Sequence, residues 1–149
     1  MLLMILTIIV FNIVLYFIPK KLSGIEMYTT SLFAIVLQLT IDMILDVKYG
    51  LYGYFSAKVV SLEAFGATFG IYPAVNIAFL NFYPFHQTFV RKSLYIVVWS
   101  GFAVLYEWLA IYTDFFYYHG WKLTYSALLY PVLYLILLGN YHFIKSLKK

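Results

Sequence analysis

The sequence has no cysteine and very little charge. Its 149 residues include only 16 of Lys, Arg, Asp or Glu, so that 11% are charged, whereas 64% are hydrophobic. Soluble domains carry about 25% charged residues, and this chain has too few to cover a surface in water. The absence of cysteine excludes a disulfide framework, a thiolate zinc site and a catalytic thiol. Together with a mean hydropathy of +0.89, these absences predict a membrane protein.

Apolar segments recur along the whole chain, each close to the roughly 20 residues that cross a 30 Å hydrocarbon core. We predict spans at residues 2–18, 25–45, 59–80, 94–113 and 123–141. The first span ends in Pro19, Lys20 and Lys21 rather than in a small-residue cleavage site, which indicates an anchor and not a removable signal peptide. The expected fold is a single all-α domain, a bundle of five transmembrane helices.

The basic residues are sorted by loop, and this predicts the orientation. Seven of the ten lie in the first loop, the third loop and the C-terminal tail, and three lie on the opposite side. The positive-inside rule then places the N-terminus outside and the C-terminus in the cytoplasm. The net charge of +4 is explained by this sorting, so we expect the lipid bilayer and no nucleic acid as a partner.

The acidic residues are sorted the other way. Five of the six fall in the outer halves or at the outer ends of predicted spans: Asp42, Asp46, Glu63, Glu107 and Asp114. An ionised side chain within the bilayer costs at least about 2.5 kcal/mol, and it usually faces the bundle interior with a partner. Five acids at one depth therefore predict one shared polar region.

Helical spacing supports a common pocket. Gln38, Asp42 and Asp46 recur every four residues and so share one face of the second span, while Glu107 and Asp114 share a face of the fourth. We expect Asp42, Glu63 and Glu107 to line the pocket, with Gln38 below them and Asp46 and Asp114 near its mouth. Tyrosine hydroxyls are expected to contribute as well, from Tyr106, Tyr112, Tyr125 and Tyr130.

Small residues recur every four positions in the third span, at Gly66, Gly70, Ala74 and Ala78. This spacing lets helix backbones approach closely, which is how helices associate in lipid. We expect the stripe to pack against another helix of this chain, a second copy or a larger membrane protein. Pro73, which lies inside the same span, is expected to kink it.

Carboxylates crowded in a poorly solvated region cannot all stay ionised, so binding of a proton, a cation or a cationic ligand is natural there. The alternative interpretation is that each acid pairs locally with a lysine or a tyrosine and only fixes helix packing. The three histidines are divided between the two sides of the membrane, which argues against a metal site, and no cofactor is expected. Aromatic residues crowd both ends of the spans, as in a membrane-interface belt.

Four stretches resemble an uncharacterised family of small polytopic membrane proteins from endospore-forming Gram-positive bacteria. They cover residues 42–55 (DMILDVKYGLYGYF), 76–85 (NIAFLNFYPF), 106–110 (YEWLA) and 120–131 (GWKLTYSALLYP). The resemblance implies a bacterial cytoplasmic membrane as the location. It implies no activity, because the family has none established.

Three functions remain open from the sequence. The first is a binding or conducting module with an outward-facing carboxylate and tyrosine pocket. The second is a non-catalytic accessory or assembly subunit, as a homo-oligomer or beside a larger partner. The third is an intramembrane acid–base enzyme acting on a lipid or isoprenoid, for which the sequence offers carboxylates but no nucleophile elbow, HExxH motif or glycine-rich phosphate loop.

Overall fold

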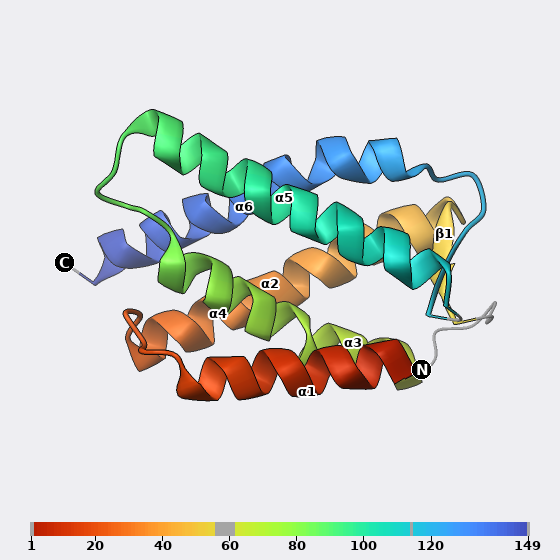
Figure 1. Ribbon diagram of the computed structural model, residues 1–149, viewed down its shortest axis with the longest axis horizontal. Helices are drawn as coiled ribbons and strands as arrows, with labels where there is room; N and C mark the ends of the chain where they lie inside the picture. The colour runs from red at the N-terminus through yellow and green to blue at the C-terminus, as the bar shows by residue number, and fades with distance from the viewer. Residues whose placement is uncertain (1, 56–61, 114, 149) are drawn as a thin grey trace.

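The computed structural model describes residues 2–55, 62–113 and 115–148, and it is a bundle of helices that run side by side along one axis (Figure 1). The helices are α1 (Leu2–Phe17), α2 (Gly24–Asp42), α3 (Leu62–Gly70), α4 (Tyr72–Phe82), α5 (Phe89–Ile111) and α6 (Leu123–Leu147). A π-helical turn, η1 (Met43–Lys48), continues α2, and two short strands, β1 (Tyr52–Tyr54) and β2 (Phe116–Tyr118), lie at one end. The start of α1 lies at the strand end of the bundle, and α6 finishes at the opposite end.

Within the described residues, four helical segments are long and apolar enough to cross a membrane. They are Gly24–Lys48, Glu63–Phe82, Phe89–Ile111 and Leu123–Leu147, and they overlap the second to fifth predicted spans. The first predicted span corresponds to α1, an apolar helix of 16 residues, which at 1.5 Å per residue is about 24 Å long. The outward faces carry large apolar side chains such as Val97 and Leu128, as lipid-facing surfaces do.

The third apolar segment is divided into α3 and α4 at Ile71. Pro73 lies in the first turn of α4, where the missing amide hydrogen of proline is tolerated. Backbone hydrogen bonds of 2.9 Å from Ile71 N to Ala67 O and from Val75 N to Ile71 O keep the two pieces joined. The predicted interruption at Pro73 is thus a change from one helix to the next.

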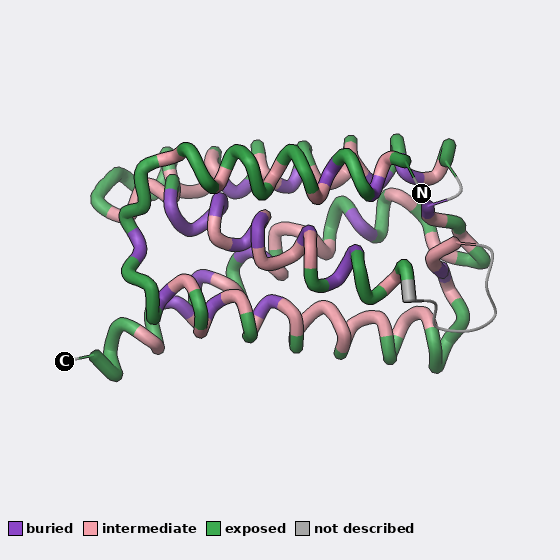
Figure 2. Tube along the Cα trace, turned by 90° about the horizontal axis from the view of Figure 1, so that it is seen from below, coloured by how far each residue is buried: buried purple, intermediate pink, exposed green. Residues whose placement is uncertain are grey.

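Helix α4 lies at the centre of the bundle. Figure 2 shows buried residues along it, and exposed residues along the outward faces of the helices around it. Phe79 is fully buried and packs in a core with Leu80, Ile96, Tyr134 and Leu138. This core lies toward the end of the bundle away from the strands.

The end of α4 also holds the loop between α1 and α2. Asn81 is 2% exposed, and its side chain accepts from Lys21 N at 2.7 Å and donates to Pro19 O at 3.0 Å. Both polar atoms of this buried amide are therefore satisfied, as buried amides require.

The small-residue stripe of the third span lies within the bundle, and its first part faces α1. A Cβ atom added to Gly70 would lie 2.9 Å from Ile8, so α1 and α3 approach closely at this glycine. Asn12 donates to the carbonyl oxygen of Gly70 at 3.0 Å across the same contact. Gly66 faces Met4, while Ala74 and Ala78 are buried in α4.

Strands β1 and β2 form a short antiparallel pair beside a fold that is otherwise mostly helical. Tyr52 faces Tyr118 and Tyr54 faces Phe116 across the pair. Gly50, with a φ of +60°, ends the π-helical turn and sends the chain into β1. The sequence-based expectation missed this sheet because three residues are too short to show an alternating pattern.

At the opposite end of the bundle, Glu26 closes the first turn of α2. It forms a capping box with Ser23, and it pairs with Lys148 of the C-terminal tail at 3.2 Å. Glu26 is 6% exposed. It is a buried carboxylate whose partners include a cation.

Candidate functional site

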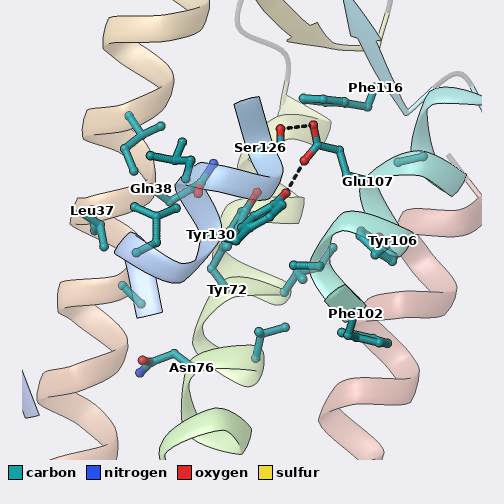
Figure 3. Close-up of a pocket in the computed structure, with 18 of the residues that line it drawn as sticks. Leu37, Gln38, Tyr72, Asn76, Phe102, Tyr106, Glu107, Phe116, Ser126 and Tyr130 are labelled. Carbon is teal, nitrogen blue, oxygen red and sulfur yellow. Dashed lines mark hydrogen bonds between the residues drawn. The ribbon is translucent and has the colours of Figure 1, made fainter. Parts of the chain in front are cut away.

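A cavity of about 190 Å³ lies between the helices below the β1–β2 pair (Figure 3). Its wall is mostly apolar and aromatic, with side chains from α1, α2, α4, α5 and α6, such as Phe11, Leu37, Val75, Phe102 and Leu133. Tyr52, Tyr54, Phe115 and Phe116 from the two strands and their flanks close the upper end. An engineered cavity of about 150 Å³ holds benzene, so this one has room for a molecule built on a single ring.

Among the described residues, Glu107 of α5 is the carboxylate that lines this cavity. It is 6% exposed, and three hydroxyl groups donate to it: Tyr118 and Ser126 to Oε1, and Tyr130 to Oε2. The bond from Ser126 is 2.6 Å, and Ser126 accepts in turn from the indole of Trp121 at 2.7 Å. Figure 3 shows Ser126 and Tyr130 pointing at Glu107 from α6. Glu107 is thus oriented by its neighbours while facing the cavity.

Asp42 of α2 has a similar set of partners, one layer behind the cavity wall. Its carboxylate accepts from Gln38 at 3.0 Å, from Tyr52 at 2.7 Å and from Tyr54 at 3.4 Å. The hydroxyl of Tyr54 is also 3.2 Å from that of Tyr72 in α4. Gln38, Tyr52, Tyr54 and Tyr72 all line the cavity, whereas Asp42 is held behind them.

The sheet connects the two carboxylates. Tyr52 and Tyr118 are directly opposite each other in the strand pair, and Tyr52 donates to Asp42 while Tyr118 donates to Glu107. The pKa of each phenol is raised, first by burial and then by the neighbouring carboxylate, which disfavours a phenolate. Both tyrosines therefore stay protonated donors at neutral pH and hold the sheet to α2 and α5.

No cation accompanies these carboxylates within the part of the chain that the structure describes. The ion pair found there joins Lys148 to Glu26, at the far end of the bundle. Over the same residues, no group of three or more His, Cys, Asp or Glu side chains is placed to hold a metal ion. Glu107 and Glu26 are both 6% exposed, but among the described residues only Glu26 has a basic partner.

The predicted site residues are brought together only in part. Gln38, Tyr106 and Glu107 line the cavity and Asp42 bonds to its wall. Asp46 lies in η1 and does not line the cavity, and Asp114 falls outside the described residues. Of the other predicted hydroxyls, Tyr130 faces Glu107, whereas Tyr112 and Tyr125 are exposed.

Glu63 corrects the sequence-based expectation. It is exposed in the first turn of α3 and does not line the cavity, so it does not share the pocket with Asp42 and Glu107. Helical spacing gives the direction of a side chain relative to its own helix, but it does not say how far that helix continues beyond its neighbours. The buried positions of α3 begin only at Ala67, one turn later.

Sequence reasoning missed Ser126, Tyr118 and Asn76 as members of the site. Ser126 and Tyr130 are four residues apart and share a face of α6, a signal that was available. Tyr118 could not be found in this way, because its position depends on the strand pairing. Asn76 interrupts an apolar span, and it lines the cavity from α4.

A second hollow lies next to the cavity, between α1 and α5. Thr7, Phe11 and Tyr106 line both spaces, and Leu6 and Val10 complete the outer one. Tyr106 donates to Thr7 at 2.9 Å across the contact between α1 and α5, which we call the α1–α5 seam. Among the described residues, Thr7, Phe11 and Tyr106 are the side chains common to both spaces, and they form the wall between them.

Comparisons with known protein families, with curated proteins and with solved structures found no match to this chain.

Proposed function

We propose that this protein is a membrane-embedded binding module for a small organic cation, held in the cavity with Glu107 as its counter-charge. The observation that carries the proposal is a buried carboxylate that lines a cavity and has no basic partner among the described residues. Burying an unpaired charge is costly, and a bound cation supplies the missing partner.

The rest of the wall suits an organic cation better than a bare metal ion. Phe116, Trp121 and Tyr130 line the cavity around Glu107, and aromatic faces attract alkylammonium groups. Three hydroxyls already occupy Glu107, and an ionised carboxylate has about four acceptor positions. The remaining position leaves room for one cationic group beside the carboxylate, whereas a metal ion needs several further ligands.

We place the cavity in the outer half of a bacterial cytoplasmic membrane. This placement rests on the sorting of basic residues, on a bundle of five spans that includes α1, and on the resemblance to membrane proteins of endospore-forming bacteria. In this orientation the β1–β2 pair faces outward. The ligand enters through the α1–α5 seam, at the wall formed by Thr7, Phe11 and Tyr106.

The competing function is an accessory subunit in which the carboxylates serve only to fix the fold. The observation that favours it is that Asp42 and Glu107 each hold one tyrosine of the β1–β2 pair. The small-residue face at Gly70 gives it less support, because α1 already occupies that face. The binding function requires a positive charge on the ligand, whereas the accessory role does not.

Thermal unfolding in lipid nanodiscs tests the proposal with two isosteric probes, phenyltrimethylammonium and neutral tert-butylbenzene. Binding to the folded state alone stabilises by RT ln(1 + [L]/Kd), about 2.7 kcal/mol at a hundredfold excess over Kd. We expect the cation to raise the melting temperature well above the effect of tert-butylbenzene.

Glu107→Gln is the deciding variant, and Glu26→Gln is its matched control. Both changes neutralise a carboxylate that is 6% exposed, but only Glu107 lines the cavity. We expect Glu107→Gln to lose the shift given by the cation and Glu26→Gln to keep it. Equal shifts for the two probes, or an unchanged shift in Glu107→Gln, would refute the proposal and leave the accessory role.

A further inference from the structure

Asn76 is a buried amide whose hydrogen-bonding atoms are both unused. It lies in α4, is 1% exposed and lines the cavity, and neither Oδ1 nor Nδ2 has a hydrogen-bond partner among the residues that the structure describes. The large majority of buried side-chain polar atoms in proteins have a hydrogen-bond partner. An orphan donor and an orphan acceptor on one side chain therefore require an explanation.

The same helix contains a direct comparison. Asn81 follows five residues later and is 2% exposed, yet both its polar atoms are bonded to the loop between α1 and α2. The two amides differ in what they face, since Asn81 faces backbone and Asn76 faces the cavity. Both amides lie in the central helix α4, so their place in this helix does not explain why Asn76 lacks the partners that Asn81 has.

The position of Asn76 sets a distance within the cavity. Tyr72 belongs to the layer of tyrosines near the strands, because its hydroxyl is 3.2 Å from that of Tyr54. Asn76 is four residues further along α4, about 6 Å deeper at 1.5 Å per residue. Figure 3 shows Glu107 toward the strand end of the cavity and Asn76 below Tyr72, toward the other end. Two polar groups thus lie at different depths of an otherwise apolar space.

We propose that Asn76 is a second anchor for the ligand, and that the ligand carries a donor and an acceptor side by side, as a primary amide does, across an apolar body from its cationic group. The proposal of an amine at one end of the ligand depends on the function proposed above, whereas the proposal of an amide at the other end depends on Asn76 alone. Paired amides satisfy both orphan atoms at once. The chemical class is thus a short, amphipathic amine with a carboxamide-like group at its far end.

Three probes separate the two ends of such a ligand. The probe 4-(aminomethyl)benzamide has both groups para on one ring, 4-methylbenzylamine lacks the amide, and p-toluamide lacks the amine. Equilibrium dialysis of the protein in nanodiscs, with empty nanodiscs as the blank, gives each dissociation constant. We expect the amide to strengthen binding about tenfold in the wild-type chain, as two modest hydrogen bonds would. No gain from the amide would mean that water alone satisfies Asn76, and it would overturn the proposal.

Asn76→Leu and Asn76→Ala assign that gain to the side chain. Both remove the amide, and the alanine variant avoids added bulk in case the leucine variant does not fold. We expect the two amines to bind equally to either variant. Ser100→Ala is the control, because the Ser100 hydroxyl is also buried without a partner among the described residues but does not line the cavity. A tenfold gain that survives in both Asn76 variants would overturn the proposal.

The stability of the empty protein gives a second readout. Because Asn76→Leu removes orphan polar atoms, we expect no fall in the melting temperature, whereas Asn81→Leu lowers it by leaving Lys21 N and Pro19 O unpaired. Equal losses in the two variants would show that Asn76 has a structural partner and would overturn the proposal.

The two proposals fail separately. If Glu107→Gln leaves the amine contribution unchanged while the amide gain persists in the wild-type chain, the cation site fails and the Asn76 site stands. If the amine contribution depends on Glu107 but the amide contributes nothing, the reverse holds.

Discussion

Replacing Glu107 by leucine tests how strongly the carboxylate holds the bundle and the strand pair together. The change leaves the hydroxyls of Tyr118, Ser126 and Tyr130 without their acceptor. Side-chain hydrogen bonds in membrane proteins average about 0.6 kcal/mol and reach about 1.7 kcal/mol. Three such bonds together give an expected loss of about 2 to 5 kcal/mol in the free energy of unfolding.

The assay is reversible unfolding in mixed micelles, followed by near-ultraviolet circular dichroism of the tyrosines. Glu63→Leu is the matched control, since Glu63 is exposed, and surface substitutions usually stay within about 0.5 kcal/mol. Glu107→Gln retains one acceptor oxygen, and we expect it to lose less than half as much as Glu107→Leu. A loss below about 0.5 kcal/mol for Glu107→Leu would refute the view that these bonds organise the site.

Three further predictions concern the surroundings of the site. Gly70→Val would place side-chain atoms against Ile8, and we expect overpacking to lower the free energy of unfolding by about 1 to 3 kcal/mol. Gly101→Val is the control, because the space beside Gly101 is open, and we expect it to change stability little. Chemical unfolding of both variants checks this. Tyr106→Phe removes the bond that crosses the α1–α5 seam, so we expect a loss near 0.6 kcal/mol and faster entry of phenyltrimethylammonium in stopped-flow fluorescence. The pKa of Tyr52 is raised in the folded protein, so the contribution of Tyr52 to stability is constant below pH 10. Above pH 10 this contribution declines, because the Tyr52 phenol loses its proton first in the unfolded chain. Titration of tyrosinate absorbance at 295 nm checks this, and we expect Tyr52→Phe to show one late-ionising phenol fewer than the wild-type chain.

Hydropathy and spacing predicted the helical framework because both depend on neighbours along the chain. The expected spans at 25–45, 94–113 and 123–141 correspond to α2 with η1, α5 and α6. Their lengths follow from the length of each apolar run. The division of the third span at Ile71 followed from Pro73, whose ring restricts the backbone locally.

The site depended on contacts that spacing does not encode. Glu63 shares the acidic character of Glu107, yet it lies on an exposed turn, because depth in a bundle depends on where neighbouring helices end. Tyr52 and Tyr118 meet only through a strand pair that joins two distant loops. An aromatic loop residue gives the same sequence signal in an interface belt as in a cavity wall, and tertiary pairing decides between the two.

A structure of the protein with phenyltrimethylammonium tests the central claim most directly. The account predicts that the ligand occupies the cavity with its nitrogen toward the Glu107 carboxylate and within about 6 Å of an aromatic ring centre, at Tyr130, Trp121 or Phe116. A ligand found only outside the cavity, or one bound with its nitrogen turned away from Glu107, would contradict it.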